Sequence, residues 1–302
     1  MSGSVRDVLV VAWYGLARSL RTRAALGILV LYVLCTTGGA WAFRQILKVL
    51  ETAAARGLGV PATDKPGAMI DELIKNQDFP DLLEAMVGNR ELVDWAVTQP
   101  YMAIAAFWTG LAITPFIAAA VGAEALAPDV ADRSIRFELA RTGRIELVSG
   151  RWVARALLLL IATIVAVLGP WAVGVFAMLG NEAGPLLLRL LADTPRLWCW
   201  ALPFLGWGVT CSQLVRNVNA ARLLATLGVA ASWVAWWFTE HELAEQVEVN
   251  IEASIIGPLY PQSWILGLWG PGWEWVGPAC GLAVIGFAAV LPGYLVFERR
   301  DV

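Results

Sequence analysis

Residues able to carry out chemistry are few and scattered in this 302-residue chain. His241 is the only histidine, which excludes a two-histidine metal site and a histidine-based catalytic triad. The four cysteines lie in apolar stretches without the spacing of metal ligands or of a disulfide framework: Cys35, Cys199, Cys211 and Cys280. The phosphate-binding pattern Gly-x-x-x-x-Gly-Lys-[Ser/Thr] does not occur. We therefore expect no catalytic, metal or cofactor site in this chain.

The composition points to a chain embedded in a lipid bilayer, since 58% of the residues are hydrophobic and 16% are charged. Thr210, Cys211 and Ser212 lie together in an apolar stretch, but no histidine or acid is near them, which disfavours an intramembrane enzyme. The same lack of acids near the middle of the apolar stretches argues against a transporter driven by protons or sodium. That secondary transporter remains an alternative.

Six stretches contain the roughly 20 apolar residues that a helix needs to cross about 30 Å of hydrocarbon. We therefore expect an all-α polytopic membrane protein with six transmembrane helices, over residues 24–43, 101–123, 152–178, 197–215, 223–238 and 276–297.

The basic residues predict the orientation of these spans. Most of the 22 Lys and Arg residues fall in the segments that share a side with the two termini, above all in 124–151 between the second and third spans. Because such residues are retained in the cytoplasm, we expect both termini to be cytoplasmic and the protein to lie in the bacterial inner membrane.

Two long segments are then expected on the outer side. Short helical stripes at 69–74 and 82–87 predict a small helical cap within 44–98, whose acidic residues form a solvated face or a site for a cation or a periplasmic partner. The segment 239–275 is apolar and rich in turns and tryptophan, so we expect a re-entrant loop. Its tryptophans suit an outer aromatic belt, and a tryptophan-lined substrate path is the alternative.

The two ends of the chain are expected to lie on the cytoplasmic side of the membrane. Apolar residues recur at helical spacing within 1–23 while Arg6, Arg18 and Arg21 lie off that stripe, which predicts an amphipathic helix in the plane of the membrane. Residues 298–302 form a short cytoplasmic tail.

The segment 124–151 is the most polar long loop, and a short amphipathic helix fits residues 130–139. Its apolar side chains alternate with charged ones: Ile135, Phe137 and Leu139 with Asp132, Arg133, Arg136 and Glu138. Apolar knobs inside a charged rim suit a groove on another protein. A helix that rests on the bilayer surface is an equal alternative on physical grounds.

This segment resembles the permease subunits of ABC-2 type ABC transporters. In that family an acidic-basic pair, a leucine-containing turn, a second basic turn and a Gly-Lys pair lead into the third span, a pattern similar to Asp132, Arg133, Ser134, Ile135, Leu139, Thr142, Gly143, Arg144, Glu146, Leu147, Gly150 and Arg151. The chain departs from the family pattern at three places. The family has Gly-Thr where this chain has Ser134-Ile135, a proline where it has Thr142, and the lysine of the Gly-Lys pair where it has Arg151. Residues 297–301 are also similar to the end of many such permeases.

The resemblance implies a conduit powered by a separate ATPase that binds ATP and Mg²⁺, with two ATPase copies and a second copy of the permease. It implies that residues 132–139 form a coupling helix seated in the ATPase, with Ile135 and Phe137 as apolar anchors and Arg133 and Arg136 as ionic partners. Gly143, Arg144, Gly150 and Arg151 would form the turn into the third span, and Trp13, Tyr14 and Arg18 would mark the elbow helix.

We therefore expect an exporter subunit. The alternative within the same family is a permease that transmits motion to a periplasmic partner protein. The lipid bilayer is an expected partner and nucleic acid is not.

Overall fold

The computed structural model describes residues 5–21, 23–58, 65–68, 84, 90–239, 259–270 and 272–299. Within these ranges the chain is helical and contains no strand, which confirms the all-α prediction. The long helices are α1 (Val5–Leu20), α2 (Arg23–Leu58), α6 (Tyr101–Ala123), α9 (Arg144–Ala166), α10 (Leu168–Ala177), α11 (Ala183–Leu214), α12 (Val218–Phe238), α16 (Val276–Ala288) and α17 (Leu291–Glu298). The shorter ones are α5 (Arg90–Ala96), α7 (Ala127–Ala131), α8 (Ile135–Leu139), η3 (Pro261–Trp264) and α15 (Ile265–Leu268).

Five helical stretches are long and apolar enough to cross a membrane: Ala25–Ala53, Tyr101–Ala131, Arg144–Ala177, Val218–Phe238 and Val276–Glu298. They identify a multi-pass membrane protein. The expected fourth span, 197–215, lies almost entirely in α11, which is not among the five. A sixth crossing by α11 stays a prediction.

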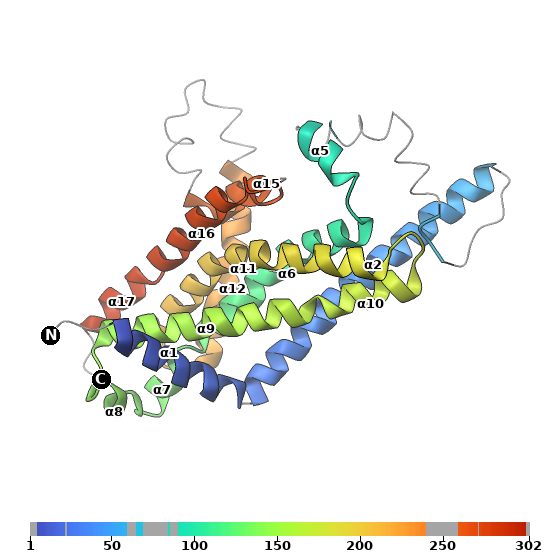
Figure 1. Cartoon of the computed structure of the whole chain (residues 1–302). Coiled ribbons are helices and arrows are strands. Elements are labelled where there is room, and N and C mark those ends of the chain that lie inside the picture. Colours follow the sequence, from blue (N-terminus) through green and yellow to red (C-terminus); the bar gives the residue numbers. More distant parts are fainter. Residues whose placement is uncertain are drawn as a thin grey trace, which may run out of the picture.

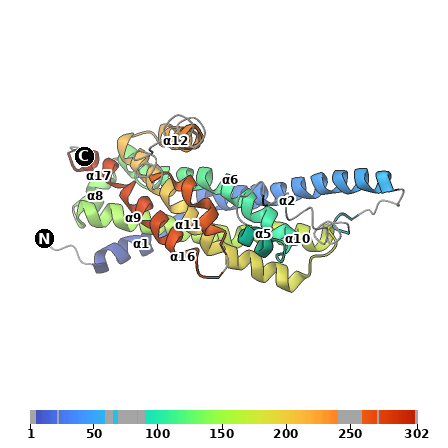
Figure 2. The ribbon, with the colours of Figure 1, turned by 90° about the horizontal axis from the view of Figure 1, so that it is seen from above.

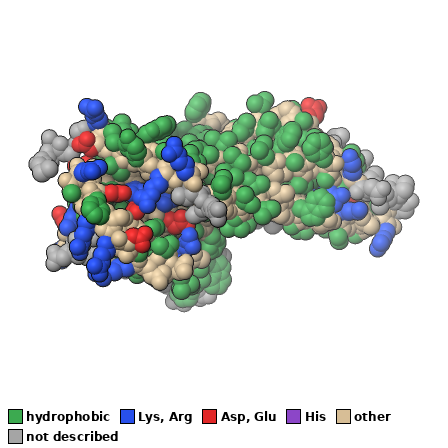
Figure 3. All heavy atoms as spheres, turned by 90° about the horizontal axis from the view of Figure 1, so that it is seen from below, with side chains coloured by type: hydrophobic (Ala, Val, Ile, Leu, Met, Phe, Trp, Pro, Cys, Tyr) green, Lys and Arg blue, Asp and Glu red, His purple; other side chains and the backbone are tan. Residues whose placement is uncertain are grey.

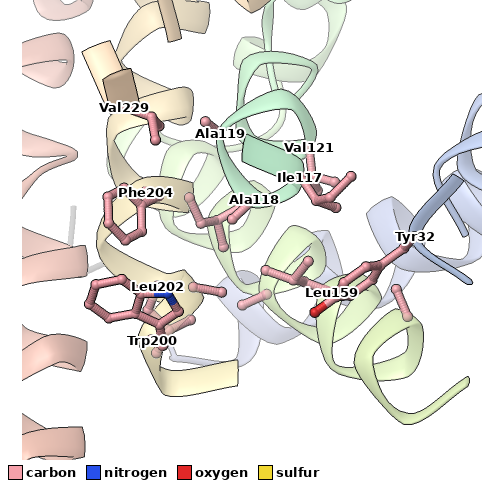
Figure 4. Packing of buried hydrophobic residues seen from close by; sticks show 14 of the residues in the cluster. Tyr32, Ile117, Ala118, Ala119, Val121, Leu159, Trp200, Leu202, Phe204 and Val229 are labelled. Atoms are coloured by element: carbon pink, nitrogen blue, oxygen red, sulfur yellow. The ribbon is translucent and has the colours of Figure 1, made fainter. Parts of the chain in front are cut away.

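The helix α11 lies in the middle of the bundle, in contact with α6, α9, α12, α16 and α17 (Figures 1 and 2). Figure 4 shows part of the buried cluster, which includes Trp200 and Phe204 of α11 together with Ala118 and Ala119 of α6. The indole Nε1 of Trp200 donates a hydrogen bond of 3.0 Å to the Leu111 carbonyl, so this buried ring has a polar partner on α6.

The helices extend beyond the expected spans at several ends. The first expected span, 24–43, is the first part of α2, which has 36 residues in all and is about 54 Å long. The far end of α2 projects past the other helices (Figure 2). The helix α11 begins 14 residues before the expected 197, and α12 begins at Val218 because the Asn217 side chain accepts hydrogen bonds from two backbone N–H groups of its first turn.

Proline marks two breaks in the expected spans. The third divides into α9 and α10 just before Pro170, and the sixth divides into α16 and α17 just before Pro292. A proline lacks the N–H that continues the helical hydrogen bonds, and its ring crowds the preceding turn. Pro115 of α6 and Pro203 of α11, in contrast, lie inside unbroken helices.

Parts of the expected outer segments lie outside the described residues, namely the stripe at 69–74, all of the stripe at 82–87 except residue 84, and residues 240–258 with His241, as do Arg300 and Asp301 of the tail. Of the expected cap, α5 and the C-terminal part of α2 are described.

Two glycines bring α6 and α11 into backbone contact. A Cβ on Gly208 would lie 2.3 Å from the Ala119 carbonyl oxygen, and one on Gly122 would lie 2.4 Å from the Leu205 carbonyl oxygen. Small residues of this kind let membrane helices approach closely and gain dispersion contacts. The contact between α6 and α11 therefore depends on the absence of side chains at both positions.

We predict that Gly208→Ala destabilises the protein by about 1–3 kcal/mol, the usual effect of overpacking, because the new methyl group meets backbone that cannot turn aside. Thermal unfolding in detergent measures it. Gly38→Ala in α2 is the matched control, since no atom lies within 4 Å of the added Cβ. Equal melting temperatures for both variants would contradict the prediction.

Candidate functional site

The loop between α6 and α9 holds two short helices where one helix over 130–139 was expected. Arg133 separates α7 from α8 and has a φ of 58°, a left-handed conformation that side chains other than glycine rarely adopt. The turn lets Asp129 on α7 and Glu138 on α8 reach the same partner, Arg151. A continuous helix would point these two carboxylates in different directions.

Arg151 is the centre of an ionic cluster that joins four helices. Its Nη2 lies 2.9 Å from Asp129 Oδ2 and 2.6 Å from Glu138 Oε1. Arg18 of α1 lies 3.1 Å from Asp129 Oδ1 and 3.8 Å from Glu138 Oε1. We call Arg18, Asp129, Glu138 and Arg151 the loop cluster. Figure 3 shows that charged side chains gather at this end of the molecule, whereas hydrophobic side chains cover its middle.

Burial makes the loop cluster a strong constraint. Asp129 is 4% exposed and Arg151 is 7% exposed, while Arg18 and Glu138 close the cluster from its solvent side. Removing one member of a buried pair leaves the other charge without compensation, which commonly costs about 3–5 kcal/mol. The loop is therefore held in a fixed position relative to α1 and α9.

Two further contacts fix the ends of the neighbouring helices. Glu124, at the end of α6, pairs with Arg222 of α12, and its carbonyl accepts a hydrogen bond of 2.9 Å from Arg155 of α9. Arg144, at the start of α9, donates to the carbonyls of Phe297 and Glu298 at the end of α17. Cations are favourable at helix C-termini, where carbonyl groups lack helical partners.

The structure corrects two roles that the resemblance implied. Ile135 is 0% exposed and packs with Leu126, Leu147 and Phe297 of the same chain, so it is not an exposed anchor. Gly150 and Arg151 lie inside α9 rather than in a turn, since α9 begins at Arg144.

Gly143 and Arg144 do lie at the start of α9. Gly150 instead lies where α9 contacts α1. A Cβ on Gly150 would lie 2.6 Å from the Val11 Cβ, so α1 packs directly on α9 there. Arg151 then projects from this contact into the loop cluster. The glycine and the arginine therefore both serve to hold α1 and the loop on α9.

The outer surface of α8 remains available to another molecule. Phe137 is 78% exposed, and Asp132, Arg133 and Arg136 are exposed around it, whereas Leu139 is half-buried. An aromatic side chain in this state, surrounded by charges of both signs, has the make-up of an interface anchor. Ser134 points inward, with its hydroxyl 3.4 Å from Asp129 Oδ1.

The helix α1 carries a second exposed apolar surface. Trp13 is 70% exposed and Tyr14 is 71% exposed, on a helix whose opposite face packs along α9 (Figure 1). Arg18, expected to belong with them, instead joins the loop cluster.

Sequence reasoning did not single out Glu124, Asp129 or the pairing of Arg222. Their signal was present in the sequence, because Glu124 and Asp129 are the acids that interrupt an apolar run from 121 to 131. An acid in such a run is buried only when it is paired. Its partner, however, lies far along the chain, so spacing alone does not reveal it.

Comparison with known proteins identifies the family of the whole chain. No curated protein matches the chain. The family model described as ABC-2 family transporter protein matches residues 9–302, which include most of α1, the loop cluster and every candidate span. A match over this length, on a multi-pass helical membrane protein, shows that the chain belongs to the ABC-2 transporter family.

Proposed function

We propose that this chain is the permease subunit of an ABC-2 exporter, powered by a separate ATPase that docks on the exposed surface of α8. The observation that carries the proposal is Phe137, an exposed aromatic side chain on a loop that buried ion pairs fix to the candidate spans. Membership of the family supports an ABC ATPase as the partner.

The loop cluster gives a route for force. A load on Phe137 acts on α8, and Glu138 of that helix is bonded to Arg151, one of the first residues of the third span, in α9. Asp129 passes the same load to Arg18 and hence to α1. Because these contacts are short and partly buried, the loop, α1 and the base of α9 move as one body. ATP and Mg²⁺ act in the partner, where closure of the ATPase supplies the load.

A second copy of the permease completes the proposed assembly, with two ATPase copies and with both termini of each permease in the cytoplasm of a bacterial cell. Support comes from α2 and α12, whose candidate spans are each only 17% buried within the chain. Apolar helix faces of this kind meet lipid or another helix.

A second candidate function is the transmission of motion to a partner outside the membrane. The length of α2 favours this function, because the whole helix is about 54 Å long and the hydrocarbon layer is about 30 Å thick, so part of the helix lies outside that layer. Ile46, Val49 and Leu50 are exposed on its outer half.

We predict that an ATPase with a phosphate-binding loop copurifies with the tagged chain in mild detergent, and that Phe137→Ala weakens this complex. Loss of a central aromatic anchor costs on the order of 2 kcal/mol, or roughly 30-fold in Kd. Phe176→Ala is the matched control, since Phe176 is also an exposed phenylalanine, 67% exposed, and lies at the C-terminal end of α10, away from α8. An unaltered Kd for Phe137→Ala would remove the docking assignment.

We predict that Asp129→Asn lowers the melting temperature and reduces the stimulation of the ATPase by the permease. The neutral amide leaves the positive charge of Arg151 less compensated in a buried position, at a cost of up to about 3–5 kcal/mol. Asp132→Asn, an exposed position in the same loop, should leave the melting temperature unchanged. Equal effects from both substitutions would show that the loop cluster has no special role.

We predict that the α8 surface is cytoplasmic. In a variant without the native cysteines, Arg141→Cys should react with a membrane-impermeant maleimide only after the cells are opened, whereas Glu91→Cys on α5 should react in intact cells. Both positions are exposed in the structure. The reverse pattern would overturn the proposed orientation and the docking site with it.

A further inference from the structure

The helix α11 buries two positive charges against one negative charge. Asp193 is 4% exposed and Arg196 is 5% exposed, and the side chain of Arg189 is 16% exposed. Within the described part of the chain, Asp193 is the only acid within ion-pair distance of either arginine. The three side chains therefore carry a net charge of about +1 in a largely water-free environment, which is costly without a compensating anion.

Arg189 forms hydrogen bonds with both carboxylate oxygens of Asp193. Its Nε and Nη2 donate to the two carboxylate oxygens at 3.1 Å and 2.7 Å, in the two-pronged geometry that guanidinium and carboxylate groups prefer. Arg196 Nη1 lies 3.6 Å from Asp193 Oδ1, which is too far for a hydrogen bond. Its Nε and Nη1 are buried and find no acceptor among the described residues.

Aromatic rings hold Arg196 in this state. Its guanidinium carbon lies 5.8 Å from the ring centre of Trp95 on α5 and 5.6 Å from that of Trp275, which directly precedes α16. The faces of these rings attract a cation, but they accept no strong hydrogen bonds.

We propose that Arg189 and Arg196 form a binding site for an oxyanion, the phosphate group of an amphipathic molecule. A phosphate oxygen would accept the unused N–H groups of Arg196, a single negative charge would balance the excess positive charge, and the indole rings would contact the apolar part of the molecule. The ligand is an anionic phospholipid or a soluble phosphate, and both share the chemistry that the site recognises.

The site differs in place from the loop cluster, since α5 and the start of α16 lie away from α8 (Figure 1). It does not require an ATPase. Failure of the docking experiments therefore leaves this proposal unaffected, and failure of the binding experiment leaves the docking proposal unaffected.

The full-length chain in detergent, studied by native mass spectrometry, tests the proposal. We expect phosphatidylglycerol to bind at least fivefold more tightly than phosphatidylcholine, roughly 1 kcal/mol. Arg196→Gln should weaken the binding of phosphatidylglycerol about tenfold or more, and Arg189→Gln should also weaken it. Arg90→Gln on α5 removes an exposed arginine and is the matched control.

Inorganic phosphate, added against chloride at equal ionic strength, distinguishes the two sources of the anion. Displacement of the lipid at millimolar phosphate indicates a site for soluble phosphate, and no displacement indicates a lipid site. If Arg196→Gln does not elute as a single species, Arg196→Lys takes its place. Equal affinity for the two lipids without competition by phosphate, or unchanged affinity in the Arg196 variant, overturns the proposal.

Discussion

The buried ion pair of Arg151 with Asp129 and Glu138 determines how the polar end of this protein is built. A guanidinium group at that depth requires carboxylates, and they must come from a loop that lies outside the candidate span. The loop meets this requirement by breaking into α7 and α8 at Arg133. The same turn buries Ile135 and leaves Phe137 exposed, so one electrostatic constraint decides which side chains the loop presents.

Close packing of backbone supports this arrangement from within the bundle. Gly150 brings α1 onto α9 beside the loop cluster, and Gly122 and Gly208 bring α6 onto α11 in the middle. Membrane helices gain little from hydrophobic association because lipid is equally apolar, so such contacts supply much of the packing energy. Ionic contacts at the end of the bundle and small residues along it therefore act together.

The sequence was sufficient for the features that depend on local pattern. Apolar length identified most of the candidate spans, and the alternation around Phe137 pointed to an exposed surface. It was insufficient where a distant partner decides the outcome. Ile135 and Phe137 have similar places in the pattern, and packing against residues of other elements, among them Phe297 far along the chain, buries Ile135 and not Phe137. The sequence did not predict the continuation of α11 through Arg189, Asp193 and Arg196, because these charged residues interrupt the apolar pattern and partly neutralise one another only in the fold.

The extent of the apolar surface of α2 has a consequence for the membrane itself. Its exposed apolar side chains run from Leu26 to Leu50, which is about 36 Å along the helix axis, somewhat more than the roughly 30 Å of an average hydrocarbon layer. An upright helix would place its last turn in the headgroups, whereas a tilted helix or a thicker bilayer would keep the whole apolar surface in hydrocarbon. Acyl-chain length thus becomes a variable that acts on this helix directly.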